Sequence, residues 1–217
     1  MAINLRIQAI SYIFLTVVSL LSISIQFNVR DDYYLLPFKF AAATKEGTTS
    51  VPANETTGVV SDFLSYKNPN LGITLMYPAD WISSTSGLVD YTDLIAFYAP
   101  LENLTDTFPP RLKLSVVTYN RNISLSEYTN FVSMILNQSK SFDIKNSSEY
   151  AISGYPSHKV IIAEKPLQNG TLLINNMNIW TIVGNRVYLV TYDGEEAKFN
   201  RYMPEVEKIL KSIHINY

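Results

Sequence analysis

The hydrophobic pattern of the first 30 residues differs from that of the rest of the chain. Residues 7–27 read IQAISYIFLTVVSLLSISIQF, an apolar run of 21 without a charged side chain. About 20 apolar residues in a helix span the hydrocarbon core of a bilayer. The run has no polar face, which argues against a helix packed on the surface of a soluble core. Residues 1–30 are therefore expected to be a transmembrane anchor, which contacts the membrane through 7–27, or a cleaved secretory signal.

A polar stretch separates this run from the first strand pattern. Between Phe40 and Gly58 small and polar residues dominate, and no apolar period is visible. Such a composition is typical of a flexible tether. The pattern therefore divides the chain into an anchor or signal at 1–30, a tether at 31–60 and a folded domain at 61–217.

Alternating apolar and polar positions predict antiparallel strands through most of the folded domain. A first hairpin is expected over 62–77, with its turn at Asn68-Pro69-Asn70 and an unusual backbone conformation at Gly72. The segments 82–93 and 102–110 are expected to be loops. Tight turns are expected at Gly154-Tyr155-Pro156, Asn169-Gly170 and Gly184-Asn185. The further strands are expected over 94–100, 111–119, 148–152, 158–164, 172–182 and 186–192.

Two segments show apolar residues at helical spacing. Ser124 and Glu127 have the spacing of a capping box, which predicts a helix over 125–139. A second helix is expected over 195–212, and its main part should begin at Pro204 because proline is favoured at the first helical position. Runs of strands with two separate helices indicate an α+β fold, in which helices pack on a twisted antiparallel sheet.

The segment GITLMYPADW, residues 72–81, joins a strand to a turn. Pro78 cannot donate to a sheet ladder, so strand pairing should stop there. Asp80 then lies in the turn, and Trp81 is expected to be buried against the sheet.

Six segments of the folded domain form a recognisable series: Phe63…Tyr66…Asn68, GITLMYPADW, FYAP at 97–100, GYPSHKV at 154–160, VYLVTY at 187–192 and ILKSIHI at 209–215. Through these segments the chain from Phe63 to Ile215 resembles the PsbP-like family. This resemblance implies the Mog1/PsbP fold, an α/β/α sandwich. An apolar amino terminus, a tether and one such domain are most similar in layout to membrane-anchored extracytoplasmic archaeal members.

Composition narrows the possible chemistry. Of the 217 residues 47% are apolar, and the formal charge is −2, so the chain can bury a core and lacks the basic excess of a nucleic-acid-binding protein. The absence of cysteine excludes disulfides, thiolate metal sites and cysteine nucleophiles. The two histidines, His158 and His214, leave little scope for imidazole chemistry.

Ser157 and His158 form a pair that would suggest a hydrolase. Adjacent residues of a strand point to opposite faces, so a serine and its base would not meet there. The sequence also lacks the Gly-x-Ser-x-Gly elbow of the α/β-hydrolases. We therefore expect no catalytic residue and no cofactor, with a hydrolase as the alternative.

Four aspartates are candidate metal ligands: Asp80, Asp90, Asp93 and Asp106. They lie on segments expected to meet at one end of the sheet, and carboxylate oxygens suit calcium or magnesium. No EF-hand spacing accompanies them, so solvated loop carboxylates are the other interpretation.

Asn-x-Ser/Thr sequons follow the apolar run at several positions. The candidate glycosylation sites are Asn54, Asn103, Asn122, Asn146 and Asn169; a sixth sequon, at Asn137, lies in a helical pattern. Plain polar loops are the alternative interpretation of each.

Together these features predict a non-catalytic extracytoplasmic domain that is tethered to a membrane, or secreted if the first segment is cleaved. It is expected to bind a partner protein or to assist a membrane complex. The alternative is a cell-surface module that binds a small ligand or a calcium-type ion.

Overall fold

The computed structural model of this chain describes residues 62–85, 93–103, 106, 108–139, 141–164 and 173–216. The expected anchor or signal, the tether and the turn at Asn169-Gly170 lie outside these residues. No helix within the described ranges has the length and apolarity needed to cross a bilayer.

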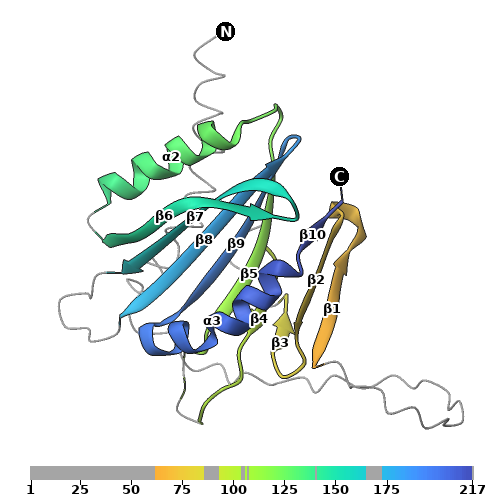
Figure 1. Cartoon of the computed structure of the whole chain (residues 1–217), viewed down its shortest axis with the longest axis vertical. Helices are drawn as coiled ribbons and strands as arrows, with labels where there is room; N and C mark the ends of the chain where they lie inside the picture. The colour runs from red at the N-terminus through yellow and green to blue at the C-terminus, as the bar shows by residue number, and fades with distance from the viewer. Residues whose placement is uncertain are drawn as a thin grey trace, which may run out of the picture.

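A seven-stranded antiparallel sheet forms the centre of the domain (Figure 1). Its strand order is β3-β4-β5-β9-β8-β7-β6. Consecutive strands from β6 to β9 are neighbours, and β5 pairs with the far side of β9. The strands are β3 (Ile82–Ser84), β4 (Asp93–Tyr98), β5 (Arg111–Thr118), β6 (Phe142–Ile152), β7 (Tyr155–Glu164), β8 (Ile174–Val183) and β9 (Arg186–Glu195).

The first hairpin belongs to a separate three-stranded sheet of β1 (Phe63–Asn68), β2 (Ile73–Pro78) and β10 (His214–Ile215). Its turn is a short 3-10 helix, η1 (Pro69–Leu71), in which the Asn68 side chain accepts a hydrogen bond from the Leu71 amide. Gly72 follows with φ of 64°, as expected. A Cβ on Gly72 would lie 1.8 Å from the carbonyl oxygen of Asn216, so both the backbone conformation and the close approach of the chain end require glycine.

The two helices, α2 (Leu125–Gln138) and α3 (Glu196–Lys211), pack on opposite faces of the large sheet (Figure 1). The capping box is confirmed, since the Ser124 hydroxyl accepts a hydrogen bond from the Glu127 amide. The α3 face also carries the small sheet, so its core is the larger of the two. The α2 core is made by Tyr119, Ile123, Tyr128, Val132, Leu136, Phe142, Val160, Ile162, Trp180, Val187 and Leu189.

Several expected boundaries are wrong. Ile82–Ser84 is not a loop but the edge strand β3, and β6 begins at Phe142 rather than at residue 148. Pro156 lies inside β7 rather than in a turn, and β10 was not expected at all. These segments are short or polar, so their strand conformation comes from pairing with neighbours and not from a local hydrophobic pattern.

The expectation that a main helix begins at Pro204 is also wrong, because α3 is continuous and contains Pro204. A proline inside a helix removes one backbone hydrogen bond. Pro204 is exposed, so water can solvate the carbonyl left without a partner. Phe199 before the proline and Val206 after it are both buried, and this packing holds the two halves in one helix.

Trp81 is 4% exposed and lies edge-on to Tyr202 of α3, which confirms that it belongs to the core. We expect Trp81→Ala to lower the free energy of unfolding by about 3–5 kcal/mol, because it leaves a cavity. The neighbouring Ile82 is 49% exposed and gives the matched control, Ile82→Ala, with a change of about 0.5 kcal/mol. Urea denaturation measures both, and similar values for the two variants would contradict this packing.

Candidate functional site

The sheet face that carries α2 is apolar over only part of its area. Under the helix it presents Val160, Trp180 and Leu189, which belong to the α2 core. Further along the same strands the side chains become polar. We name this part the polar region, and it consists of Arg111, Lys113, Asn176, Asn178, Thr191 and Asp193.

Strand alternation and register place these side chains side by side. Thr191 and Asp193 continue the face of Leu189, because side chains two residues apart point the same way. In the first row, Asp193 lies between Arg111 of β5 and Asn176 of β8. In the second row, Thr191 lies between Lys113 and Asn178 in the same way. The polar region thus crosses three adjacent strands at the middle of the sheet.

Hydrogen bonds connect the members of the polar region. The Thr191 hydroxyl donates to Asn178 Oδ1 at 3.1 Å, and Asn178 Nδ2 donates to Asn176 Oδ1. Arg111 donates twice to Asp193, from Nε at 3.2 Å and from Nη2 at 3.3 Å. A two-point contact of this kind fixes the orientation of both side chains.

The Arg111–Asp193 pair is largely removed from water. The Asp193 side chain is 1% exposed and that of Arg111 23%. Burial would lower the pKa of Arg111, but the charge of Asp193, the nearby Tyr98 and the hydrogen bonds to both together outweigh it and raise that pKa, so the guanidinium remains charged. Burial raises the pKa of Asp193, and the charges of Arg111 and Lys113 act in the opposite direction. Two hydrogen bonds from a charged guanidinium favour the carboxylate form of Asp193.

Polar groups at the centre of a sheet need an explanation beyond stability. Burying them costs free energy that their mutual hydrogen bonds only partly return. Valine or isoleucine would suit the same central-strand positions, and replacing a buried ion pair with apolar residues is often neutral or stabilising. Places where a chain departs from such rules are the first candidates for function.

Glu164, at the end of β7, adds a second carboxyl group beside the polar region. Its Oε1 is buried and accepts no hydrogen bond from the residues that the structure describes. Burial and, secondarily, the negative charge of Asp193 raise the pKa of Glu164 to about 7. Near neutral pH this group is therefore divided between a charged and an uncharged form.

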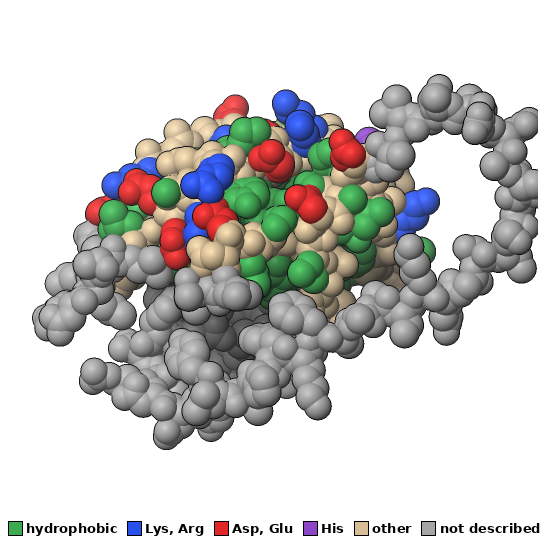
Figure 2. Space-filling model, turned by 90° about the horizontal axis from the view of Figure 1, so that it is seen from below, with side chains coloured by type: hydrophobic (Ala, Val, Ile, Leu, Met, Phe, Trp, Pro, Cys, Tyr) green, Lys and Arg blue, Asp and Glu red, His purple; other side chains and the backbone are tan. Residues whose placement is uncertain are grey.

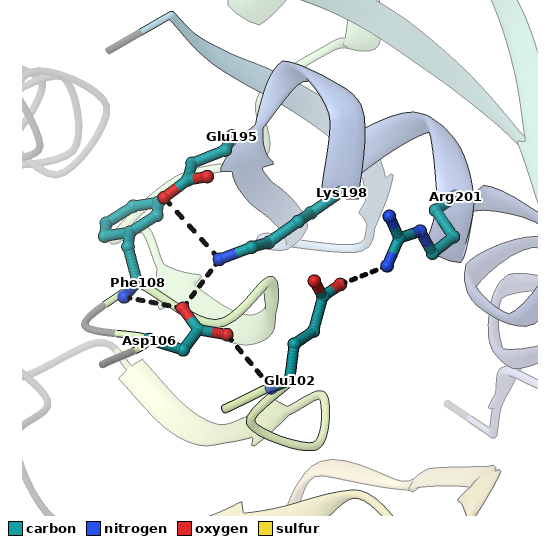
Figure 3. A network of polar contacts seen from close by, with 6 residues as sticks. All are labelled: Glu102, Asp106, Phe108, Glu195, Lys198 and Arg201. Carbon is teal, nitrogen blue, oxygen red and sulfur yellow. Dashed lines mark hydrogen bonds and ion pairs between the residues drawn. The ribbon is translucent and has the colours of Figure 1, made fainter. Parts of the chain in front are cut away.

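A separate ionic network attaches the segment after β4 to α3 (Figure 3). Lys198 Nζ contacts Asp106 Oδ1 at 2.6 Å and Glu195 Oε1 at 3.5 Å. Arg201 contacts Glu102 at 2.6 Å, and the amides of Glu102 and Phe108 donate to the two Asp106 oxygens. Burial would raise the pKa of Asp106, but the hydrogen bonds from Lys198 and the backbone outweigh it and lower that pKa. Asp106 thus holds the segment after β4 against α3.

Of the four candidate metal ligands, the structure describes the side chains of Asp80 and Asp106. Asp106 faces Lys198, and Asp80 is exposed in the turn after β2. Asp90 and the side chain of Asp93 lie outside what the structure describes. Within the described residues, no three Asp, Glu or His side chains are grouped so as to hold a metal ion.

The side chains of Ser157 and His158 lie on opposite faces of the sheet, as expected for adjacent residues of a strand. The Ser157 hydroxyl is bonded to the Ile152 amide and the Tyr155 carbonyl. His158 lies over Trp180, with ring centroids 5.3 Å apart, and bonds to the Ser147 hydroxyl at 2.9 Å. The serine hydroxyl and the imidazole are therefore held apart in separate environments.

Four of the six sequon asparagines lie within the described residues, and all four are exposed: Asn103, Asn122, Asn137 in α2, and Asn146. Asn54 and Asn169 lie outside the described residues.

The polar region was not among the residues singled out from the sequence. Its signal is present, because polar residues recur at a spacing of two in three strands: 111 and 113, 176 and 178, and 191 and 193. The same alternation marks a strand with one face in water, so only the strand order shows that these positions are buried and adjacent.

Glu164→Gln tests the electrostatics at the polar region. A carboxyl group whose pKa is raised by folding stabilises the fold below its unfolded-state pKa, and this contribution is lost as the pH rises through about 7. We expect the wild-type free energy of unfolding to decrease between about pH 5 and about pH 8 relative to that of the variant. Urea denaturation of both proteins at the two pH values cancels the other titrating groups. Parallel pH dependence would show that Glu164 is not perturbed.

Comparison with known proteins identifies the fold. No protein-family profile matches the sequence, and no curated protein matches it either. Cyanobacterial PsbP (CyanoP) from Synechocystis sp. PCC 6803 is similar in structure, with a TM-score of 0.53 and 11% identity over 76% of this chain and 99% of that one. LpqN of Mycobacterium tuberculosis, described as involved in cell envelope biogenesis, is similar with a TM-score of 0.53 and 16% identity over 67% of this chain and 83% of its own. The described domain therefore has the PsbP-like fold that the sequence resemblance implied.

Proposed function

We propose that this chain is a non-catalytic accessory protein on the outer side of a membrane, where its domain binds a partner protein through Arg111, the partly exposed member of the polar region. Residues 7–27 hold it to the membrane, and residues 31–60 give the domain reach from the surface. If the first segment is cleaved, the same domain acts as a secreted binding protein.

The arrangement of the polar region carries this proposal. Its buried members hold Arg111 in a fixed position on a rigid sheet, which is the preorganisation that selective binding requires. Arg111 is its partly exposed member, and the two hydrogen bonds to the buried Asp193 fix the orientation of its guanidinium. A partner that presents a carboxylate or another hydrogen-bond acceptor would suit this group.

Two further observations support an accessory role. The face seen in Figure 2 carries acidic and basic side chains next to one another with apolar ones between, so a partner there would meet a mixed surface. LpqN, which shares the fold, is described as involved in cell envelope biogenesis, a setting in which a tethered domain of this kind would fit. Asp106 is committed to Lys198, which disfavours the alternative of a calcium-type site at that position.

The experiment is crosslinking of the full-length protein on intact cells with a reagent that cannot cross membranes, followed by capture from washed membranes. The test variant is Arg111→Met/Asp193→Leu, which replaces both members of the buried pair. We expect wild type to yield one reproducible crosslinked protein and this variant to lose it about tenfold or more, corresponding to at least about 1.4 kcal/mol.

The matched control is Arg121→Met/Glu127→Leu, which removes an exposed Arg–carboxylate pair at the start of α2. This control should capture as much of the crosslinked protein as wild type. Circular dichroism establishes that both variants are folded. Equal capture by all three proteins would refute binding through the polar region, and no labelling on intact cells would refute the location.

A further inference from the structure

Strand β6 forms an open edge of the large sheet. It is 11 residues long and pairs with β7 on one side, and none of the described strands pairs with its other side. The opposite edge is β3, with only three residues. A long strand edge is a template for pairing with another chain, so proteins usually protect it.

A β-bulge lies in the middle of this edge. Ile144 is opposite Ile162 and Asn146 is opposite Ile161, so Lys145 has no opposite residue in β7. Asn146 directly follows the bulge and its side chain is exposed. A bulge and a lysine are two devices that weaken edge pairing, but Ile144 is also exposed on this strand and favours association.

Asn146 is the first residue of the sequon Asn146-Ser147-Ser148. The Ser148 hydroxyl donates to Asn146 Oδ1 at 3.1 Å, so the two side chains that define the sequon are already in contact. The sequon at Asn122 differs, because the hydroxyl of Ser124 caps α2 through the Glu127 amide. Asn137 lies in the last turns of α2, where its sequon is wound into a helix.

We propose that Asn146 is N-glycosylated and that its glycan covers the open edge of β6. The inference rests on the proposed function only in that the domain must be exported. In the reaction, Asn146 Nδ2 forms a bond to the anomeric carbon of a lipid-linked oligosaccharide. The bond from that carbon to the lipid phosphate breaks, the phosphate leaves with the electron pair, and Nδ2 releases one proton.

The position of Asn146 explains why a glycan there would be useful. A bulky and strongly hydrated group near the centre of an 11-residue edge blocks an approaching strand on both sides of the bulge. Asn146 is opposite Ile161, which packs against the α3 core, so its side chain lies on the other face of the sheet from the polar region. The glycan would therefore suppress edge-to-edge association and leave the binding site accessible.

The test compares the full-length wild type with Ser148→Ala and Ser148→Thr, each produced in a host that glycosylates exported proteins. Ser148→Ala keeps Asn146 but destroys the sequon, and Ser148→Thr keeps it. We expect mass spectrometry of the peptide containing Asn146 to show a sugar in wild type and Ser148→Thr but none in Ser148→Ala. Sedimentation velocity should show wild type and Ser148→Thr without self-association and Ser148→Ala with dimers or larger species.

The possible failures are distinguishable. Exported wild-type protein without a sugar on Asn146 would overturn this inference and leave the proposed function standing. A glycan on Asn146 with no increase in self-association of Ser148→Ala would overturn the shielding role. Protein that protease treatment of intact cells cannot reach would overturn both the proposed location and this inference.

Discussion

The domain depends on the burial of strand β9 on both of its faces. Val187 and Leu189 pack into the α2 core, whereas Tyr188 and Val190 pack into the α3 core. The strand is flanked by β5 and β8, so its backbone groups are paired on both sides as well. Side chains between the two half-buried ends of β9, Arg186 and Glu195, therefore lie in the interior, and their polar groups must find hydrogen-bond partners there.

Because of this constraint, the polar side chains of Thr191 and Asp193 are unusual at their positions. They lie on the α2 face of β9 beyond Leu189, where two more apolar residues would continue the core. The chain instead places a hydroxyl and a carboxylate there and supplies partners from both neighbouring strands. Three neighbouring strands thus carry polar residues at paired positions where apolar residues are usual. Polar residues on all three strands at once indicate a common feature of the sheet and not a single exception. A fully hydrogen-bonded buried network of this kind makes the core rigid and specifies one arrangement of it at some expense of stability.

Much of the fold can be predicted from the sequence because strong local signals agree with it. The capping box at Ser124, the turns at Asn68-Pro69-Asn70 and Gly184-Asn185, and the succession of β7, β8 and β9 all follow from local pattern and are present in the structure. The separation of β1 and β2 into a second sheet could not be predicted, since it depends on the chain end returning as β10 beside β2. The polar region could not be predicted from the sequence for a similar reason. Its alternation is visible in each strand, but only the order β5-β9-β8 brings the three sets of polar residues together.

The central claim is that the polar region is maintained for binding and not for stability. The most direct test is the free energy of unfolding of the triple variant Asn176→Val/Asn178→Val/Thr191→Val, which removes the whole hydrogen-bonded series at once and leaves none of its members without a partner. Valine suits central strands, so the account predicts a stability equal to or above that of wild type in urea denaturation. A loss of about 3 kcal/mol or more would contradict it, because losses of that size mark residues whose interactions hold the fold together.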